Sequence, residues 1–299
     1  MKRVILDATT LTAFQLCEEY YNLRHNHNLI PIGGKGRGLE GGSMMHEMLA
    51  TYYRTQMAGL HRDDRIASAI STGQTFITGC EHCINPDVKC IIHTDHPFTG
   101  LESLTIEEAH DVLGNFQQYV ERWKNDSWTT VNVEYVKGKV IYEDDELSLL
   151  WKAKIDWEVD NLEGIFSVDH KTFSRRERTL NTDNQFIGQS IVTEQTKVFV
   201  NKIGTQKTVK PEEKFERITL NYTKNRMAEW INECASYAYD LLAIHESGSY
   251  RHRFKMCSGK YGPCRYNEVC EGEPSDRQRI LLEKYKIADK VWDATNDEA

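Results

Sequence analysis

The chain has 299 residues, of which 39% are hydrophobic and 27% charged, a composition typical of a soluble globular protein with a sizeable core. Its 45 acidic and 37 basic residues give a net charge of −8, which excludes a strongly basic coat protein but not an enzyme that meets DNA in one groove. No apolar run approaches the ~18 residues of a membrane helix, and the N-terminus lacks the apolar stretch of a signal peptide.

The first hundred residues alternate between helical and irregular patterns. Residues 8–25 carry apolar side chains at helical spacing. Six glycines between positions 33 and 42 predict a mobile loop, without the spacing of a phosphate loop, and Ser43 is the predicted cap of a helix over 44–57. Residues 60–100, with three cysteines, four histidines and little periodicity, predict an insertion with its own local cross-link.

The pattern becomes regular after residue 100. Thr105 and Glu108 form a capping box at the start of a helix that reaches about Trp123. A period of two over 129–172 predicts three successive strands. A helix over about 183–198, a strand over 216–222 and a long helix over 223–246 follow. The tail begins with clustered cysteines and ends in a polar helix and an acidic terminus.

Two carboxylates and a lysine are predicted to meet at one edge of the sheet. Residues i and i+2 of a strand face the same side, so Asp169 and Lys171 point together, and a neighbouring strand can bring Asp156 beside them. Close carboxylates repel unless a cation lies between them, and a hard divalent cation takes oxygen ligands. Metal, water and lysine together favour phosphodiester hydrolysis. The alternative is a surface hairpin with a salt bridge.

The order of these motifs resembles the PD-(D/E)XK nuclease superfamily, in particular its RecB-like exonuclease branch. GGSMMHEML matches the helix whose glycine precedes a metal-binding histidine, AKID matches the GxxD element, VDHKT the (D/E)xK element and NQFIGQS the QxxxY helix. The resemblance implies Mg²⁺ or Mn²⁺ bound by metal ligands His46, Asp156, Asp169 and the backbone carbonyl of His170, with Lys171 as catalytic lysine and Gln185 in the glutamine position. Two positions depart from the family pattern, Ala153 for glycine and Gln189 for tyrosine. Glu134 is either a further acid near the site or a solvent-facing strand residue.

Cys257, Cys264 and Cys270 form a C-x6-C-x5-C pattern, in which glycine and proline permit tight turns. Three thiolates leave a four-coordinate metal one ligand short. Several nucleases of the RecB-like branch close a [4Fe–4S] cluster with one N-terminal and three C-terminal cysteines, and Cys17 fits the N-terminal position. The resemblance therefore implies a cluster that joins the two ends of the chain. A zinc site with the same four thiolates, or unrelated buried cysteines, are the alternatives.

Two further sets of residues are candidates for binding. Cys80, Cys83, Cys90 and His93 have the spacing of a small zinc site, although a reduced loop without metal fits equally well. The basic run after the third strand includes Arg175 and Arg176, which together with Gln185 are candidate DNA contacts; a solvated loop is the alternative. No base-reading motif occurs, so we expect sequence-independent recognition.

We therefore expect an α/β fold, with a central mixed sheet flanked by helices around a restriction-endonuclease-like core. A single nuclease domain would span 1–272, with the insertion at about 60–100, followed by a helical tail over 273–299. The expected activity is Mg²⁺- or Mn²⁺-dependent hydrolysis of DNA, from an end, in repair, recombination or phage DNA metabolism in the cytoplasm of a bacterial or phage-infected cell.

The sequence leaves partners and rival functions open. No helicase phosphate loop is present, so any unwinding would need a helicase or recombination partner. A structure-specific endonuclease uses the same residues. A non-catalytic DNA-binding or assembly subunit, with the cysteine cluster as its scaffold, is the rival outside enzymology.

Overall fold

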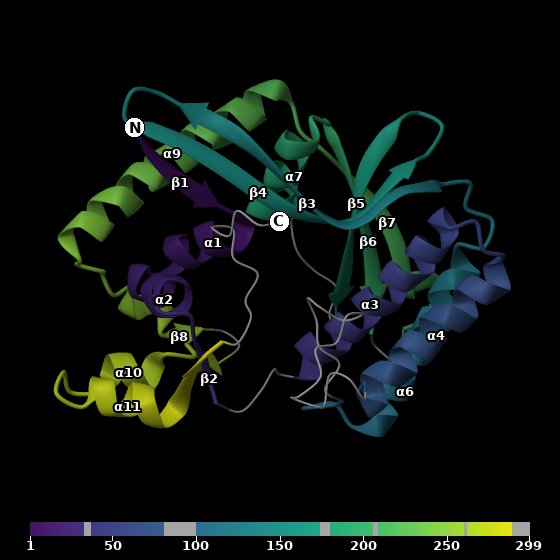
Figure 1. The fold of residues 1–299 in the computed structure, drawn as a ribbon, viewed down its shortest axis with the longest axis horizontal. Coiled ribbons are helices and arrows are strands. Elements are labelled where there is room, and N and C mark those ends of the chain that lie inside the picture. Colours follow the sequence, from purple (N-terminus) through teal and green to yellow (C-terminus); the bar gives the residue numbers. More distant parts are fainter. Residues whose placement is uncertain (33–36, 81–99, 174–179, 206–208, 260–261, 289–299) are drawn as a thin grey trace.

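A six-stranded mixed sheet forms the centre of the computed structural model, which describes residues 1–32, 37–80, 100–173, 180–205, 209–259 and 262–288. Five of its strands lie in the order β1-β4-β5-β6-β7. The sixth, β3, pairs with the edge of β4 that neither β1 nor β5 uses. Figure 1 shows the sheet at the top of the molecule, with helices below and beside it. The strands are β1 (Lys2–Leu6), β3 (Thr129–Glu143), β4 (Leu147–Asp160), β5 (Ile165–Phe173), β6 (Lys197–Gly204) and β7 (Phe215–Asn221).

Two hydrophobic cores bury the sheet against helices. In the first core, α1, α7 and α9 pack on β1, the first half of β4 and β6, around side chains such as Trp151 and Phe186. In the second, α3, α4 and α6 pack on the second half of β4 and on β5–β7, around Trp157 and Phe116. The helices are α1 (Ala8–Leu16), α3 (Arg37–Met57), α4 (Arg62–Thr78), α6 (Ile106–Arg122), α7 (Asn184–Thr193), α8 (Pro211–Lys214) and α9 (Lys224–Ser247).

A small lobe joins the two ends of the chain (Figure 1, purple and yellow). Strand β10 (Tyr285–Ile287) pairs with β2 (Leu29–Pro31), and β8 (Ser258–Gly259) pairs with β9 (Gly262–Pro263). Its helices are α2 (Glu18–Tyr21), α10 (Asn267–Glu271) and α11 (Arg277–Lys284). Leu23, Tyr266, Val269 and Tyr285 form a third buried cluster. The lobe therefore depends on contacts between residues more than 200 positions apart.

Strand β4 changes its neighbour halfway along, and this change positions the site. One edge of β4 pairs with β1 from Leu147 to Trp151 and with β5 from Trp157 to Asp160. Its opposite edge pairs with β3 over the whole length. Between these two partners, no strand pairing of β4 on this edge is present from 152 to 156 among the described residues. This interval between β1 and β5 is the fork of the sheet.

Several predicted elements are confirmed. The three strands expected over 129–172 are β3, β4 and β5, and the long helix expected over 223–246 is α9, which Thr223 caps. The capping box before α6 is present: the Glu108 N–H donates to the Thr105 hydroxyl, and the Thr105 N–H donates to the Glu108 carboxylate. A central mixed sheet flanked by helices is also confirmed.

Three predicted helix boundaries were wrong, and the tail contains a strand that was not predicted. Helix α3 begins at Arg37, so the glycines from 38 to 42 are helical rather than looped, and the Ser43 hydroxyl donates to the Leu39 carbonyl instead of capping. Helix α7 ends at Thr193, because Glu194 adopts a left-handed C-cap, and Val198 belongs to β6. The helical stretch over 8–25 is interrupted at Cys17 and continues as α2 and a π-helical turn at Asn22–Asn26. The tail adds strand β10 to the expected helix.

The expectation of an irregular segment over 60–100 was wrong for its first part. Residues 62–78 form α4, whose partly buried Ile66, Ile70, Phe76 and Ile77 pack on the second core. Gly73 lies where α4 approaches α3, since a Cβ there would come within 2.9 Å of Met48 Sδ. None of the described helices is long and apolar enough to cross a membrane.

Candidate active site

Three carboxylates face one another across three adjacent strands at the fork. Val133 pairs with Trp157 and Tyr135 with Ile155, so Glu134 of β3 lies opposite Asp156 of β4. On the other side, Trp157 pairs with Val168, which puts Asp169 of β5 next to Asp156 where the β4–β5 pairing ends. The His170 N–H donates to Asp156 Oδ2 at 2.9 Å. Side chains in register on neighbouring strands are close, and like charges there repel.

Helix α3 adds an imidazole to this row. His46 Nδ1 lies 3.5 Å from Asp156 Oδ2, and one ligand atom each from His46, Glu134 and Asp156 lie within 4.8 Å of one another. Gly42, one turn earlier, explains how α3 comes so near, because a Cβ there would lie 3.0 Å from Thr172 Oγ1 of β5. In the predicted pair of Gly42 and His46, the glycine therefore has a steric role: it lets α3 approach β5.

Burial sets the charge state of these groups. Burial and the neighbouring Glu134 raise the pKa of Asp156 to about 6. Burial also raises the pKa of Asp169 to about 7, against the opposing charge of Lys171. Burial lowers the pKa of His46, which favours the neutral imidazole that binds metals. Carboxylates that repel in a buried row, beside a neutral imidazole, are a donor set that fits a hard divalent cation.

Lys171 and Gln185 complete the constellation on the side of β5. Lys171 Nζ lies 3.2 Å from Asp169 Oδ2 and donates to Gln185 Oε1 at 2.7 Å. Gln185, at the start of α7, donates from Nε2 to Asp169 Oδ1 at 2.5 Å. Burial acts to lower the pKa of Lys171, but Asp169 and Asp156 outweigh it and raise the pKa. The structure therefore favours a charged ammonium, held beside the carboxylate row by Gln185.

Sequence reasoning underrated Glu134 and missed Lys154. Glu134 has a φ of +51°, a left-handed conformation that is strained for a side chain of its size and is common at functional sites. Lys154 lies two residues before Asp156 on the same face of β4, and its Nζ is 2.6 Å from Glu134 Oε2. The sequence did contain a signal for Lys154: it lies two residues before Asp156, so both side chains are expected on the same face of the strand.

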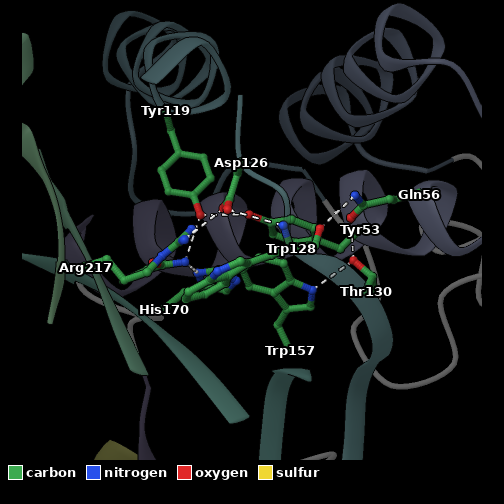
Figure 2. A network of polar contacts seen from close by, with 10 residues as sticks. Tyr53, Gln56, Tyr119, Asp126, Trp128, Thr130, Trp157, His170 and Arg217 are labelled. Atoms are coloured by element: carbon green, nitrogen blue, oxygen red, sulfur yellow. Dashed lines mark hydrogen bonds and ion pairs between the residues drawn. The ribbon is translucent and has the colours of Figure 1, made fainter. Parts of the chain in front are cut away.

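A buried network of polar and aromatic side chains, shown in Figure 2, holds the side chain of His170 on strand β5. The His170 ring stacks on Tyr53 with an interplanar angle of 3°, and its Nδ1 is 3.2 Å from Asn201 Nδ2. Asn201 also donates to Tyr119 Oη at 2.8 Å, and Tyr119 bonds Tyr53 at 2.8 Å. Burial lowers the pKa of His170 well below its usual value, so the ring is neutral. The side chain of His170 faces away from the row, as predicted from the alternation of strand side chains.

Arg217 of β7 anchors the far end of the network. It donates from Nε to Asn201 Oδ1 at 2.8 Å and pairs with Asp126 at 2.8 Å. Its guanidinium lies 3.6 Å from the ring centroid of Trp128 and 4.2 Å from that of Trp123. Buried cation–aromatic and charge-paired contacts of this kind are strong. His170, whose N–H binds Asp156, is therefore held by a chain of contacts that runs from Asp126 through Arg217 and Asn201.

The four predicted cluster cysteines are neighbours in the small lobe, although their sulfur atoms do not all lie within 4.8 Å of one another. Cys17 Sγ accepts from the Arg253 N–H at 3.5 Å, and the Cys264 N–H donates to the Cys257 carbonyl at 2.8 Å. Burial and the neighbouring thiols of Cys264 and Cys17 raise the pKa of Cys257. Burial, and to a smaller extent the neighbouring Cys257, raise the pKa of Cys270 to about 12. The break of the first helix at Cys17 serves this arrangement, since extended backbone there presents the thiol to the C-terminal segment.

Other candidate residues fall outside the described part of the chain. Cys80 is buried, but Cys83, Cys90 and His93 are not among the described residues, and neither are Arg175 and Arg176. Glu40 is an addition that the sequence did not suggest. Its buried carboxylate accepts from the N–H groups of Glu102, Ser103 and Leu104 at 2.6–2.7 Å, and it ties the chain after residue 100 to α3.

Comparisons with known proteins identify the family to which the chain belongs. Among solved structures, the chain is similar to the crystal structure of SSO0001 (13% identity, TM-score 0.32, covering 56% of this chain and 71% of that one). It is also similar to LHK-Exo in complex with dAMP (9% identity, TM-score 0.33, covering 69% of this chain and 95% of that one). No curated protein matches the sequence. The family model of the PD-(D/E)XK nuclease superfamily matches residues 6–271, from β1 to the end of α10, and the chain belongs to that superfamily.

Proposed function

We propose that this protein is a metal-dependent DNA nuclease that hydrolyses phosphodiester bonds, from a DNA end, in repair, recombination or phage DNA metabolism. The observation that carries the proposal is the row of Glu134, Asp156 and Asp169 across three strands, with His46 above it and Lys171 beside it. A purely structural sheet gains nothing from three carboxylates in register.

The residues suited to hold Mg²⁺ or Mn²⁺ are His46, Asp156, Asp169 and the His170 carbonyl, and Glu134 joins them on geometry. When bound, the cation would supply Lewis-acid chemistry at the phosphate and lower the pKa of a water. The protein's own contribution is to hold the oxygen ligands in place before DNA arrives. The contacts of His170 with Tyr53 and Asn201 support this pre-organisation from behind.

Lys171 is better suited to position the attacking water and to offset phosphate charge than to accept a proton. Its carboxylate neighbours raise its pKa despite burial, so in the metal-free protein it is an ammonium. Gln185 keeps its Nζ beside Asp169. A cation held at the point where negative charge develops contributes through electrostatics.

Cleavage of end-labelled linear DNA tests the proposal. Single- and double-stranded substrates are incubated with Mg²⁺, Mn²⁺ or chelator, and products are resolved over time. Wild type should cut only with metal, and Lys171→Ala should lose at least about 100-fold in rate, as for removal of one oxyanion donor. Lys139→Ala is the matched control, because Lys139 is an exposed lysine that forms an ion pair with the exposed Glu194. A folded wild-type protein that binds DNA but never cuts supports the rival, a non-catalytic assembly subunit.

The product pattern separates the two nuclease alternatives. Release of mononucleotides or short products from one labelled end, with no cutting of circular DNA, identifies an exonuclease and its polarity. Cutting of circles or of defined flaps identifies an endonuclease. Addition of a helicase tests for a partner, since the chain carries no phosphate-loop motif of its own.

We also propose that Cys17, Cys257, Cys264 and Cys270 bind a [4Fe–4S] cluster that joins the ends of the chain, with Zn²⁺ as the alternative. Supporting this is the place of Cys17 beside the segment that carries Cys257, Cys264 and Cys270, more than 230 residues later in the chain. Iron, sulfide and zinc analysis of protein purified without oxygen distinguishes the two metals. Cys264→Ser should lose the metal and lower the stability of the lobe, whereas the buried Cys234, in the first core, should tolerate Cys234→Ala without metal loss.

The Cys80, Cys83, Cys90 and His93 set remains a proposed zinc site of the insertion. Zinc analysis of Cys80→Ser tests it. If this segment is an adaptor for a partner, the variant should lose partner binding and keep its nuclease activity.

A further inference from the structure

The segment that leads from α9 into the cysteine lobe has an unusual surface. Residues 251–256 read Arg-His-Arg-Phe-Lys-Met, with three basic residues and no acidic one. Phe254 is 71% exposed and Met256 is 42% exposed. An exposed phenylalanine forgoes the stabilisation that burial gives. Scattered apolar side chains on a surface are common, but an aromatic ring flanked by cations is typical of nucleic-acid-binding segments.

The exposed ring is held rather than loose. His252 and Phe254 stack with ring centroids 5.6 Å apart and an interplanar angle of 11°. Arg251 on one side is bound to the buried Glu18, with its Nε 2.7 Å from Oε1. Phe254 itself begins a 3-10 turn that ends at Met256. The two rings thus lie parallel and stacked, with Phe254 the more exposed of the pair, on a segment that the Arg251–Glu18 contact ties to α2.

This surface is connected to the candidate active site by a short line of contacts. Arg253 Nη1 donates to the Gln15 carbonyl at 2.7 Å, and Gln15 Oε1 accepts from Asn184 Nδ2 at 2.9 Å. Asn184 precedes Gln185, which bonds Asp169 and Lys171. In Figure 1, β8, which follows the segment, lies below α1 and beside α2. The aromatic pair is therefore tied through Gln15 of α1 to α7, the helix that carries Gln185.

We propose that His252 and Phe254 form a stacking platform for unpaired bases of single-stranded DNA, with Arg253 and Lys255 contacting the phosphates. The inference rests on the proposed nuclease function and specifies its substrate. A base in a duplex has both faces covered by its neighbours, so a ring surface selects an unpaired strand. Stacking accepts every base, because each has a π-face, and this fits a protein without a base-reading motif.

Equilibrium binding without cleavage tests the platform. The full-length protein is titrated in chelator with a fluorescent single-stranded oligonucleotide and with the matching duplex. Phe254→Ala should weaken single-strand binding about 10-fold, within the range that loss of one stacked base produces, and leave duplex binding unchanged. Phe254→Trp should restore the affinity. Leu282→Ala is the matched control, since Leu282 is equally exposed, at 76%, but lies on α11 without a stacked ring.

Salt dependence and base fluorescence report on the same contacts. Lys255→Ala should reduce the slope of log affinity against log salt by about 0.7, the value for one phosphate contact on a single strand. A 2-aminopurine base should be quenched by wild type and by Phe254→Trp, but not by Phe254→Ala. Thermal unfolding of each variant shows whether it is folded, and Phe254→Leu, which keeps the apolar volume, should bind as weakly as Phe254→Ala.

The outcomes separate this inference from the nuclease proposal. Equal losses for single strand and duplex, or no loss in Phe254→Ala, overturn the platform, and the second result would favour a protein partner for this surface. A wild type that binds single strands through Phe254 but never cuts leaves the platform standing and overturns the nuclease proposal. Failure of wild type to bind any DNA overturns both.

Discussion

Replacing Asp169 by asparagine should stabilise the metal-free protein at alkaline pH while it abolishes cleavage. Burial raises the pKa of Asp169 from 3.8 to about 7, although Lys171 opposes the shift. Between about pH 4 and pH 7 the folded protein keeps a proton that the unfolded chain has lost. Stability therefore falls as pH rises through this window, and the full cost of the buried charge is present above it.

The size of the effect follows from the shift. A difference of about 3 pKa units corresponds to about 4 kcal/mol of unfolding free energy at pH 8. Asparagine cannot ionise, so it removes this cost, but it leaves the Lys171 ammonium with a weaker partner. We expect a net gain of about 2–4 kcal/mol at pH 8, equivalent to a rise in Tm of about 4–10 °C. At pH 4 the aspartic acid is already neutral in the folded protein, and the gain should vanish.

Urea unfolding of wild type and Asp169→Asn in chelator, at pH 4 and pH 8, measures both values. Asp126→Asn is the control of opposite sign, because Asp126 pairs with the buried Arg217 and its loss should cost about 3–5 kcal/mol at pH 8. Mn²⁺ should stabilise wild type at pH 8 and Asp169→Asn much less. A gain that is absent at pH 8, or equally large at both pH values, would refute the reasoning.

Four further substitutions test separate parts of the structure. Glu134→Gln should raise the Mn²⁺ concentration for half-maximal cleavage about 10-fold or more, as titration calorimetry can verify independently of activity. Gln185→Ala should lower kcat about 10-fold with little change in KM, because it releases Lys171 from Asp169. Arg217→Met should cost about 3–5 kcal/mol in urea unfolding, by leaving the Asp126 charge unpaired. Gly188→Ala should destabilise by about 1–3 kcal/mol or more, since the new Cβ would meet Trp151 Nε1.

Local patterns in the sequence were sufficient to predict the centre of the site. The period of two over 129–172 predicted β3, β4 and β5, and the i, i+2 relation predicted that Asp169 and Lys171 share a face. The proximity of Asp156 followed from strand adjacency alone. These inferences succeed because an antiparallel meander needs only short turns, and its alternation is set by each strand's own buried face.

The place of Glu134 could not be read in the same way. Its position opposite Asp156 depends on the register of a long hairpin, which contains irregularities between Thr130 and Asn132 and between Val140 and Tyr142. Each irregularity shifts the pairing by one residue, and a shift of one residue moves a side chain to the other face. The left-handed backbone at Glu134 is likewise set by tertiary contacts, because glutamate has no intrinsic preference for it.

Helix α3 shows why a glycine run was misread. Glycine disfavours helix in isolation, so the sequence between 33 and 42 predicts a loop. Within the fold, a Cβ at Gly42 would lie 3.0 Å from Thr172 Oγ1, whereas a Cβ at Gly41 would make only ordinary contacts with Leu104 and Val112. Tertiary contact therefore selects glycine inside this helix and overrides its propensity. The same close approach brings His46 within reach of Asp156.

Along β4 and β5, the proposed metal ligands alternate with buried aromatic side chains. This alternation lets the same strands carry the candidate site and a stable core. Asp156 precedes Trp157 on β4, and His170 lies between Asp169 and Lys171 on β5. Strand geometry sends the acidic and basic side chains to one face and Trp157 and His170 to the other. There they stack on Tyr53, with ring centroids 3.8 Å and 5.7 Å away. The carboxylate row, whose members repel one another, is thus carried by strands whose opposite face holds the buried, stacked rings of Trp157 and His170, and these contacts keep the metal-free site in shape.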